Sequence, residues 1–432
     1  MRVCLVGSGG REHALAVSLS RTAEVVVTPG NPGMSTGPGR ADDRRRITVT
    51  ETPAEHLEAD LYVIGPEQPL VEGLADRLRG EGRLVFGPGA DGARMEGSKA
   101  FMKEVLAEAG VPTARFGAFD HEEVGEAIWF LRSLEGPWVV KTDGLAAGKG
   151  VLVTEDLGEA EADVRAKLSG ESFGEAGRRV VIEEGLVGEE CSLLVVTDGT
   201  RVVPLAPAQD FKRLLDGDGG PNTGGMGAYS PVAAATDRLV DQILDEAVEP
   251  TLAALRRRGI DYRGVLYAGL MLTAEGPRIL EYNVRFGDPE TQVVLPRFEE
   301  DLTALLAEAA SGRLRLQPRT SPGAAVCVVM AAEDYPASPR VGDRIDGLEA
   351  VALLPGVTAF HAGTRLDGEG AVVTAGGRVL GVTATGADLP TARDRAYQAA
   401  ELISWEGAQY RTDIALAAAR AAAPESTTGR NR

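Results

Sequence analysis

The stretch Lys141-Thr-Asp-Gly-Leu-Ala-Ala-Gly-Lys149-Gly150 places two lysines around a loop of small residues. Short apolar runs flank it, Pro137-Trp-Val-Val140 before it and Val151-Leu-Val153 after it. Glycines let a backbone approach a phosphate closely, and ammonium groups neutralise phosphate charge. The stretch is no P-loop, because Lys149 precedes a glycine and a β-rich run follows where a helix would begin. It predicts a glycine-rich hairpin between two strands that covers a nucleotide, with a solvated surface hairpin as the alternative.

The composition limits the class of protein. A chain of 432 residues with 44% hydrophobic and 25% charged residues is ordinary for a globular protein of roughly two to four domains. Its 64 acidic and 45 basic residues give a net charge of −19, which argues against a nucleic-acid or anionic-membrane partner. An anionic ligand must therefore be held by local positive groups, and a bound Mg²⁺ would fit that situation.

The cysteines and the N-terminus indicate the compartment. Cys4, Cys191 and Cys327 each lie in an apolar, strand-like run, which favours buried reduced thiols over disulfides or a zinc site. The first apolar run is too short for a signal peptide, and no stretch approaches the roughly 20 apolar residues of a membrane span. We expect a cytoplasmic protein.

The first third of the chain has the pattern of an open parallel sheet. Val3-Cys-Leu-Val6 runs into Gly7-Ser-Gly-Gly10 and then into a helical pattern. The helix N-terminus of such a unit offers free N–H groups to an anion. Further strand-like runs follow up to residue 86, and each ends at Gly or Pro. Glu67 follows one of these ends, so it is a candidate substrate contact, although an exposed turn glutamate is the more common explanation.

A helix is predicted from Lys99 to Ala109. Ser98 can cap its N-terminus, and Gly110 can end it. Lys99 and Lys103 stand one turn apart and away from the apolar stripe, so the pattern alone predicts that both are solvated.

Two segments in the middle of the chain carry candidate binding residues. Residues 179–196 have the pattern of two strands around an acidic connection. Glu183 or Glu184 could accept a hydrogen bond from an amino group, and Glu190 could accept from ribose hydroxyls; an ordinary acidic turn is the alternative. Residues 217–231 carry many glycines, with Asn-Thr, Met and Tyr-Ser among them. Because ordering glycine is costly in backbone entropy, we favour a ligand-binding loop there over a flexible linker.

The clearest local signal is a hairpin over residues 264–285. Strand alternation puts Glu281, Asn283 and Arg285 on one face. It puts Leu280, Tyr282 and Val284 on the other. A carboxylate and an amide oxygen two residues apart suit Mg²⁺, and Arg285 could meet a transferring phosphoryl group. An amphipathic strand whose polar face meets water is the alternative.

The C-terminal region, from about residue 320, is rich in strand-like runs. They lie at 324–330, 351–354, 371–374 and 378–383, with a closing helix at about 391–403. No catalytic constellation is visible there, and we interpret His361 as structural. Residues 424–432 are predicted to form a disordered tail.

Five motifs, in this order along the chain, resemble a known family. They are Gly7-Ser-Gly-Gly-Arg-Glu-His13, Gly65-Pro-Glu-Gln-Pro-Leu70, the Lys141–Gly150 stretch, Gly220-Pro-Asn-Thr-Gly-Gly-Met-Gly-Ala-Tyr-Ser-Pro231 and Glu281-Tyr-Asn-Val-Arg-Phe-Gly-Asp-Pro-Glu-Thr-Gln292. From residue 1 to about 420 the chain resembles the phosphoribosylamine–glycine ligase (glycinamide ribonucleotide synthetase) family of the ATP-grasp superfamily.

The resemblance implies a multidomain fold of the α/β and α+β classes. Its expected parts are a pre-ATP-grasp, Rossmann-like domain with an open parallel sheet at 1–100, an ATP-grasp domain at 101–318 with a small lid at about 118–188, a C-terminal β-rich domain at 319–423 and a disordered tail at 424–432.

The resemblance also implies roles for individual residues. ATP would be bound by Lys103 and Lys141 at its phosphates, by Gly148 in the lid hairpin, by Glu183, Glu184 and the backbone of Leu186 at adenine, and by Glu190 at ribose. Glu281 and Asn283 would hold Mg²⁺ or Mn²⁺, and Arg285 and Lys149 would be catalytic. The substrate-binding candidates are Gly9 and Gly10 for a sugar phosphate, Glu67, Asp210 and Asp288 for ammonium or hydroxyl groups, and Asn222, Thr223, Gly224 and Gly225 in the glycine-rich loop.

The sequence departs from the pattern of the family in two respects. Gly269, Leu270 and Met271 occupy the strand where many ATP-grasp enzymes place another carboxylate, so the metal would depend on phosphate oxygens and water. Phe211 stands where we expect histidine more often in this family, so no proton transfer is assigned to it.

The implied reaction joins glycine to 5-phosphoribosylamine through a glycyl phosphate and gives glycinamide ribonucleotide, ADP and phosphate. The expected partners are these small molecules and ATP, with the protein as a monomer and without nucleic acid or membrane. One alternative is another ATP-grasp carboxylate–amine ligase with a different acid and amine. The other is a nicotinamide-dependent dehydrogenase, but Glu12 replaces the third glycine of the dinucleotide motif.

Overall fold

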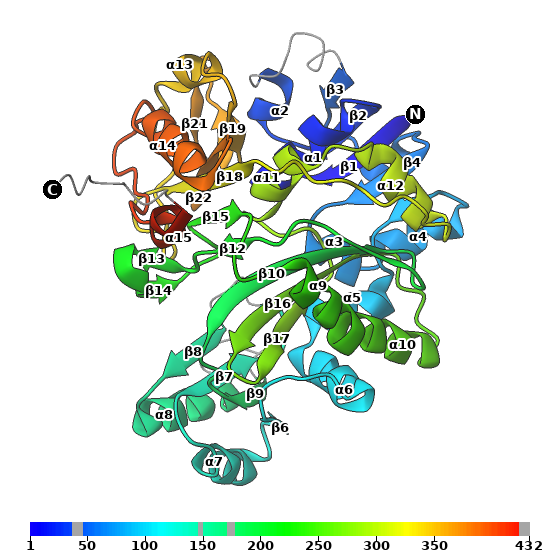
Figure 1. Ribbon diagram of the computed structural model, residues 1–432, viewed down its shortest axis with the longest axis vertical. Coiled ribbons are helices and arrows are strands. Elements are labelled where there is room, and N and C mark those ends of the chain that lie inside the picture. The colour runs from blue at the N-terminus through cyan, green and yellow to red at the C-terminus, as the bar shows by residue number, and fades with distance from the viewer. Residues whose placement is uncertain (37–45, 146–149, 171–177, 423–432) are drawn as a thin grey trace, which may run out of the picture.

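The computed structural model describes residues 1–36, 46–145, 150–170 and 178–422 (Figure 1). The centre of the glycine-rich hairpin, residues 146–149, and the predicted tail at 424–432 lie outside the described residues. Within the described ranges, no helix is both long and apolar enough to cross a membrane.

Five parallel strands form the N-terminal sheet, in the order β3-β2-β1-β4-β5. They are β1 (Arg2–Gly7), β2 (Glu24–Pro29), β3 (Ile47–Val49), β4 (Leu61–Ile64) and β5 (Val85–Phe86). The helices of this region are α1 (Gly10–Leu19), α2 (Pro32–Thr36), α3 (Glu67–Val71), α4 (Leu74–Gly80) and α5 (Ala90–Gly97). The strands β1 and β4 are buried on both faces, as a parallel sheet covered by helices requires. The predicted open parallel sheet is confirmed.

Helix α6 spans Lys99–Ala109, as predicted. The Ser98 side chain caps it, and Gly110 ends it in the left-handed conformation at φ 69°. The prediction that its lysines are solvated is wrong, since Lys103 is 0% exposed and Lys99 is half-buried. The strand β9 (Arg179–Glu184) packs on the face of α6 that looked free in the sequence.

Two antiparallel four-stranded sheets follow α6. The lid sheet has the order β6-β9-β7-β8, and the central sheet has the order β11-β10-β16-β17. Their remaining strands are β6 (Phe116–Asp120), β7 (Trp138–Thr142), β8 (Val151–Thr154), β10 (Glu189–Thr197), β11 (Val202–Pro204), β16 (Gly264–Thr273) and β17 (Gly276–Asn283). Because β7 and β8 pair on either side of the lysine-flanked loop, the predicted strands of this hairpin are confirmed.

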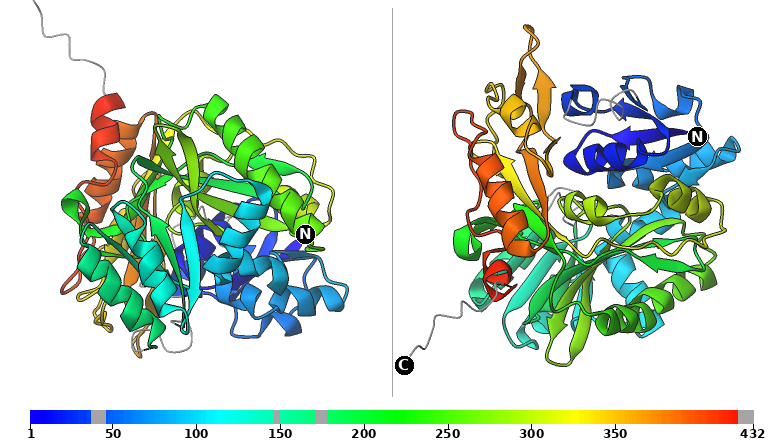
Figure 2. Two further views of the ribbon diagram at one scale, coloured as in Figure 1. Left: turned by 90° about the horizontal axis from the view of Figure 1, so that it is seen from below. Right: turned by 45° about the horizontal axis from the view of Figure 1, so that its top comes forward.

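Each of these sheets has its own covering. Helices α7 (Val124–Arg132) and α8 (Leu157–Leu168) enclose a separate hydrophobic core with the lid sheet. A long helical segment covers one face of the central sheet (Figure 2). It consists of α9 (Asp237–Ile243), a π-helical turn at Leu244–Val248 and α10 (Glu249–Arg257). On the other face, with α12 (Leu302–Ala310), the central sheet shares a core with the N-terminal sheet.

The β16–β17 hairpin confirms the predicted one, with one interruption of the strand alternation. A β-bulge lies at Leu280, between two regular pairs of the ladder. Tyr282 and Val284 enter the core as predicted. The prediction for Leu280 is wrong: the extra residue breaks the alternation, and Leu280 lines a cavity together with Glu281.

The C-terminal sheet combines strands from two distant parts of the chain, in the order β12-β15-β18-β22-β19. The strands β12 (Gln209–Asp210) and β15 (Gly227–Ser230) come from the glycine-rich middle, and β18 (Ala324–Ala331), β19 (Val357–His361) and β22 (Arg378–Gly386) come from the C-terminal region. Helix α14 (Leu389–Ala400) packs on this sheet. The remaining elements are the strand pairs β13 (Arg213–Leu215) with β14 (Gly219–Asn222) and β20 (Thr364–Leu366) with β21 (Val372–Thr374), and helices α11 (Thr291–Val294) and α15 (Leu416–Ala422).

The prediction of a strand at 351–354 is wrong. The short helix α13 (Leu348–Ala352) begins after Gly347, which has φ 90°, and only Val351 of this helix is buried. An apolar run of four residues does not distinguish a strand from a helical turn that contacts the core through one side chain.

Two buried histidines lie where the N- and C-terminal domains meet. His13 Nδ1 in α1 accepts the N–H of His361 in β19 at 2.8 Å, and the ring centroids are 5.8 Å apart. Burial, together with a smaller effect of the neighbouring His361, lowers the pKa of His13 to about 3. Burial also lowers the pKa of His361 to about 4. Both rings are therefore neutral in the folded protein over the physiological pH range, and they pack the interface as uncharged groups.

This interface predicts a loss of stability in mild acid. The unfolded chain takes up a proton at His13 near pH 6.5, whereas the folded chain does so only near pH 3. The stabilisation is therefore complete above pH 6.5 and decreases as the pH falls, by about 1.4 kcal/mol per pH unit for one such group. Urea unfolding between pH 7 and pH 5 measures this slope.

The substitution His13→Asn should reduce that slope, because an amide oxygen can still accept the His361 N–H but does not titrate. The control is His121→Gln, at an exposed histidine, which should leave the slope unchanged. If the free energy of unfolding depended equally on pH in the unsubstituted protein and in His13→Asn, the pH dependence could not be assigned to His13.

Candidate active site

A cavity of about 1140 Å³ lies where the lid sheet, the central sheet and the two terminal domains meet. The predicted site residues that line it are Glu67, Lys141, Glu183, Glu184, Leu186, Glu190, Asp210, Asn222, Thr223, Gly224, Glu281, Asn283, Arg285 and Asp288. The described residues Lys103, Gly9, Gly10 and Gly225 are not part of this lining. Lys149 and Gly148 lie outside the described residues. The fold thus brings distant motifs of the sequence to one cavity.

A buried carboxylate joins the two lysines that were predicted to contact phosphates. Glu183 Oε2 lies 2.9 Å from Lys103 Nζ, and Glu183 Oε1 lies 2.8 Å from Lys141 Nζ. Burial raises the pKa of Glu183, but Lys141 and Lys103 lower it more, and the net shift is downward. Glu183 is therefore ionised and neutralises both lysines in part.

The two lysines occupy different places. Lys103 is 0% exposed and donates to Thr113 Oγ1 at 2.7 Å, and burial lowers its pKa to about 8. Lys141 borders the cavity and donates to Leu280 O at 3.2 Å. Of this pair, Lys141 can reach a ligand directly, whereas Lys103 lies behind Glu183.

The strand β17 presents the predicted metal ligands to the cavity. Asn283 Nδ2 donates to Glu281 Oε1 at 3.4 Å, and Asn283 Oδ1 accepts from Arg285 at the same distance. Burial raises the pKa of Glu281, but Lys212, Lys141 and Lys99 lower it to a net value below its usual range. The carboxylate is thus an ionised oxygen ligand without an ion pair among the described residues.

The donor set of this strand fits a hard divalent cation in part. One carboxylate and one amide oxygen are ligands that Mg²⁺ accepts beside phosphate and water. Within the described ranges, no group of three or more His, Cys, Asp or Glu side chains is placed to hold a metal. The glycine and apolar residues at 269–271 add no further carboxylate to this pair.

Two carboxylates fix Arg285 at the edge of the cavity. Its guanidinium lies 2.9 Å from Glu96 Oε1 and 3.3 Å from Glu67 Oε2. Burial lowers the pKa of Arg285, but Glu96 and Glu67 raise it to a net value above its ordinary range. Glu67, expected to contact substrate, thus also orients Arg285.

Sequence reasoning missed Lys212. Its Nζ lies 2.9 Å from Asp210 Oδ1 and also forms an ion pair with Glu190. Burial lowers the pKa of Lys212, but Asp210 and Glu190 raise it well above its ordinary value. The signal was present in the sequence, since Lys212 follows Asp210 by two residues and strand alternation would put both on one side.

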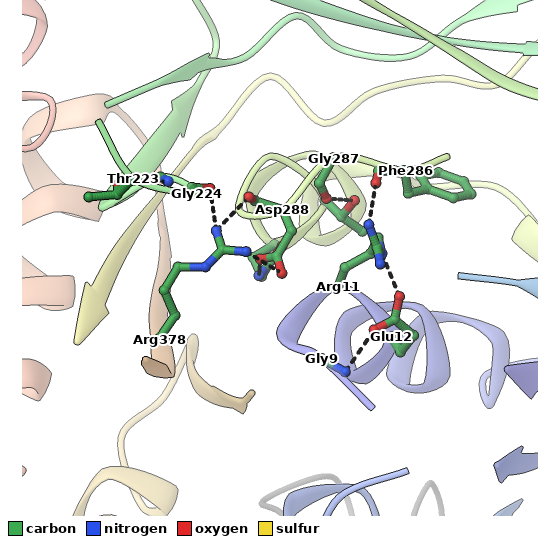
Figure 3. A network of polar contacts seen from close by, with 12 residues as sticks. Gly9, Arg11, Glu12, Thr223, Gly224, Phe286, Gly287, Asp288 and Arg378 are labelled. Atoms are coloured by element: carbon green, nitrogen blue, oxygen red, sulfur yellow. Dashed lines mark hydrogen bonds and ion pairs between the residues drawn. The ribbon is translucent and has the colours of Figure 1, made fainter. Parts of the chain in front are cut away.

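Two arginines hold the loop that follows β17 (Figure 3). Arg11 donates to Phe286 O at 3.2 Å, and Arg378 donates to Asp288 O at 2.7 Å. Arg11 belongs to α1 and Arg378 to β22, so the N- and C-terminal domains contact this loop from two sides. Neither arginine was among the residues predicted from the sequence.

The glycine turn before α1 is closed by a side chain of its own helix. The N–H of Gly9 donates to Glu12 Oε2 at 2.7 Å (Figure 3). Glu12 is 1% exposed and also forms an ion pair with Arg11. The Glu12 carboxylate thus occupies the place beside the Gly9 N–H where the pyrophosphate of a dinucleotide would bind. This geometry disfavours the dehydrogenase interpretation.

These features define a class of protein. A lid sheet with a glycine-rich, lysine-flanked hairpin faces a second antiparallel sheet that carries a carboxylate–amide pair, as in ATP-grasp enzymes. The chain belongs to the phosphoribosylglycinamide synthetase family. The N domain of that family matches residues 1–96, its ATP-grasp (A) domain matches residues 97–291 and its C domain matches residues 325–417.

Individual relatives agree with this assignment. The chain is 52% identical to a phosphoribosylamine–glycine ligase of Streptomyces coelicolor, over 98% of this chain and 100% of the relative. A crystal structure of the phosphoribosylamine–glycine ligase of Thermotoga maritima is 37% identical, with a TM-score of 0.82 over 96% of this chain and 100% of that one. The biotin carboxylase domain of the 2-oxoglutarate carboxylase of Hydrogenobacter thermophilus, at 17% identity and a TM-score of 0.68 over 95% of this chain and 91% of that one, shares the fold.

The burial of Lys103 yields a test of stability. Lys103→Met removes one cation from a fully buried ion pair and leaves Glu183 partly uncompensated. We expect the free energy of unfolding to fall by about 3–5 kcal/mol, measured by urea denaturation.

The matched control is Arg132→Met, which breaks the ion pair of an exposed arginine with Glu161. This substitution should lower the free energy of unfolding by less than about 1 kcal/mol. If both variants lost the same free energy of unfolding, the buried Lys103–Glu183 ion pair would stabilise the fold no more than the exposed Arg132–Glu161 pair does.

Proposed function

We propose that this chain is an ATP-dependent ligase that joins glycine to 5-phosphoribosylamine and gives glycinamide ribonucleotide, ADP and phosphate. This is a step of purine biosynthesis. One observation carries the proposal. A chain of this family places Lys141, Glu281 and Asn283 around one cavity, with Asp288 and the glycine-rich loop beside them.

The chemistry explains why ATP is needed. The carboxylate of glycine is a poor electrophile, because oxide would have to leave. Attack of a glycine carboxylate oxygen on the γ-phosphorus of ATP breaks the bond to ADP and gives glycyl phosphate. The ribosylamine nitrogen then attacks the carbonyl carbon, phosphate leaves, and the amine loses a proton. The protein has little covalent work to do, so its task is to position the reactants, stabilise charge and exclude water.

The lid side of the cavity would hold the nucleotide. Lys141 borders the cavity and would contact phosphate oxygens, with Glu183 and Lys103 behind it. By the resemblance, Glu183, Glu184 and the backbone of Leu186 would contact adenine, Glu190 would contact ribose, and Gly148 and Lys149 would close over the phosphates. Glu183 is already paired with two lysines, whereas Glu184 accepts the N–H of Arg115 at 2.9 Å and lies 3.8 Å from Arg278.

The strand β17 would hold the metal ion, for which Mg²⁺ or Mn²⁺ is the proposed choice. Glu281 and Asn283 offer the two oxygen ligands. When bound, the ion would neutralise phosphate charge and polarise the γ-phosphoryl group. Arg285, held by Glu96 and Glu67, would stabilise charge on the transferring group.

The same cavity would hold the two other substrates. Asp210, Glu67 and Asp288 are candidates for ammonium or hydroxyl groups, with the loop from Asn222 to Gly225 beside them. Gly9 and Gly10 lie next to Asp288. A sugar phosphate bound there would compete with Glu12 for the Gly9 N–H.

We further propose that the protein acts as a monomer in the cytoplasm. Its three cysteines are buried and unpaired, as expected in a reducing compartment. Light scattering of the purified protein tests the monomer, since a mass of twice 45.3 kDa would contradict it.

Glycine-dependent formation of ADP with synthesised 5-phosphoribosylamine tests the reaction. Label from ¹⁸O in the carboxylate of glycine should appear in the released phosphate, because the acyl phosphate keeps that oxygen. Turnover with another acid and without glycine would assign the chain to a different ATP-grasp ligase. Unlabelled phosphate would exclude the glycyl phosphate.

The role of Glu281 predicts a separation of activity from stability. Glu281→Gln should lower turnover at least about 100-fold, because a neutral amide is a poor ligand for a divalent ion. The melting temperature should change by less than about 2 °C, since the side chain borders the cavity and makes no ion pair with any residue that the structure describes.

The control is Glu275→Gln, at the exposed turn of the same hairpin. It should keep full turnover. A loss of melting temperature in Glu281→Gln that matches the loss of activity would make Glu281 a structural residue.

A further inference from the structure

Among the residues that the C-terminal domain contributes to the edge of the cavity is an arginine that the proposed reaction does not yet use. Arg378 lies at the start of β22 and lines the cavity. One terminal nitrogen of its guanidinium donates to Gly224 O and to Asp288 O, the latter at 2.7 Å. The other donates to Asp288 Oδ2 at 3.0 Å. Figure 3 shows this guanidinium between the glycine-rich loop and the loop after β17.

The two loops approach so closely that each depends on the position of the other. A Cβ atom at Gly224 would lie 3.0 Å from Cζ of Arg378, and one at Gly225 would lie 2.6 Å from Cδ of Pro289. Gly225 also has φ 109°, which strains any other residue. The guanidinium therefore packs on the loop backbone as well as bonding to it.

Asp288 receives hydrogen bonds on both of its oxygens. Gln292 Nε2 donates to Oδ1 at 2.6 Å, and Arg378 donates to Oδ2. Burial raises the pKa of Asp288, but Arg378 and Arg11 lower it more, and the net shift is downward. The carboxylate is thus ionised and fixed in one orientation, with its charge offset by Arg378.

These contacts lie at the end of the cavity remote from the lid. The candidate nucleotide ligands Lys141, Glu184 and Leu186 belong to or adjoin the lid sheet, at the bottom of Figure 1. Arg378 belongs to the C-terminal domain at the top, and its three bonds are to Gly224 and Asp288. A change at Arg378 should therefore affect the non-nucleotide substrates first.

We propose that Arg378 is a positioning residue of the ligase reaction, which fixes the Gly224 carbonyl and the Asp288 carboxylate at the binding site of the phosphoribosylamine. The inference rests on the proposed function and adds the C-terminal domain to the site of the amine substrate. Arginine suits this role because a planar guanidinium can donate to three oxygens at once, whereas a lysine is a point donor.

Steady-state kinetics of Arg378→Met and Arg378→Lys test the proposal. In Arg378→Met the KM for 5-phosphoribosylamine should rise tenfold or more, while the KM for ATP stays within twofold of the unsubstituted enzyme. Arg378→Lys should recover part of the loss, because one ion pair to Asp288 can re-form. Gly224→Ala should raise the same KM, since its methyl group displaces the guanidinium without removing its charge.

The control is Arg393→Met, in the same domain. Arg393 also donates to two backbone carbonyls, those of Ile414 and Thr412, but it does not line the cavity. It should leave all three KM values unchanged. If Arg378→Met fails to fold, Gly224→Ala alone decides.

An unchanged KM for the amine in Arg378→Met or Gly224→Ala would overturn the proposal. An equal rise in the KM for ATP would also overturn it, because Arg378 would then be a general structural residue. The unsubstituted enzyme distinguishes a failure of the proposed function from a failure of the proposed role of Arg378. If it shows no glycine-dependent turnover, the proposed function fails; if it turns over and the variants keep their KM values, only the role of Arg378 fails.

Discussion

The structure depends on the buried carboxylate of Glu183, which joins the lid to the strand that carries the metal candidates. One of its two lysine partners donates to Thr113 Oγ1, which in turn donates to Ile279 O at 2.6 Å. The other, Lys141, donates to Leu280 O at 3.2 Å. A bulge leaves a residue out of the ladder, so the Leu280 carbonyl can accept a bond from outside the sheet. The base of the lid and the strand β17 are thus tied together although the lid has a separate core.

Contacts from the N- and C-terminal domains also meet at the loop that follows β17. Arg285 within it pairs with Glu96 of the N-terminal domain, Arg11 from α1 donates to Phe286 O, and Arg378 from β22 donates to Asp288. Charge-assisted bonds of this kind are stronger and more directional than neutral ones. All three domains therefore set the shape of one short segment, next to the residues proposed to bind metal and amine.

The local sequence pattern was sufficient to predict an element when the burial of its side chains is decided within that one segment. The alternation from Glu281 to Arg285 placed the polar side chains toward the cavity, because Tyr282 and Val284 had to enter a core. It could not place Lys103, whose partner Glu183 lies 80 residues away and covers a second face of α6. For the same reason the sequence could not reveal Arg378, or that β12 and β15 join the C-terminal sheet: these depend on pairings between distant segments.

Charge balance connects the overall composition to the site. The chain carries a net charge of −19. Four cations around the cavity are paired with its own carboxylates: Lys141 with Glu183, Lys212 with Asp210 and Glu190, Arg285 with Glu96 and Glu67, and Arg378 with Asp288. Lys99, which also lines the cavity, donates instead to Gly144 O at 2.9 Å. A triphosphate that bound here, as proposed, would therefore enter a site whose positive charge is neutralised in part. In the proposed reaction a divalent cation adds positive charge, and the ionised Glu281, which has no lysine or arginine ion pair among the described residues, would hold that cation. On this proposal, part of the positive charge that binds a triphosphate to this acidic protein comes from the metal ion.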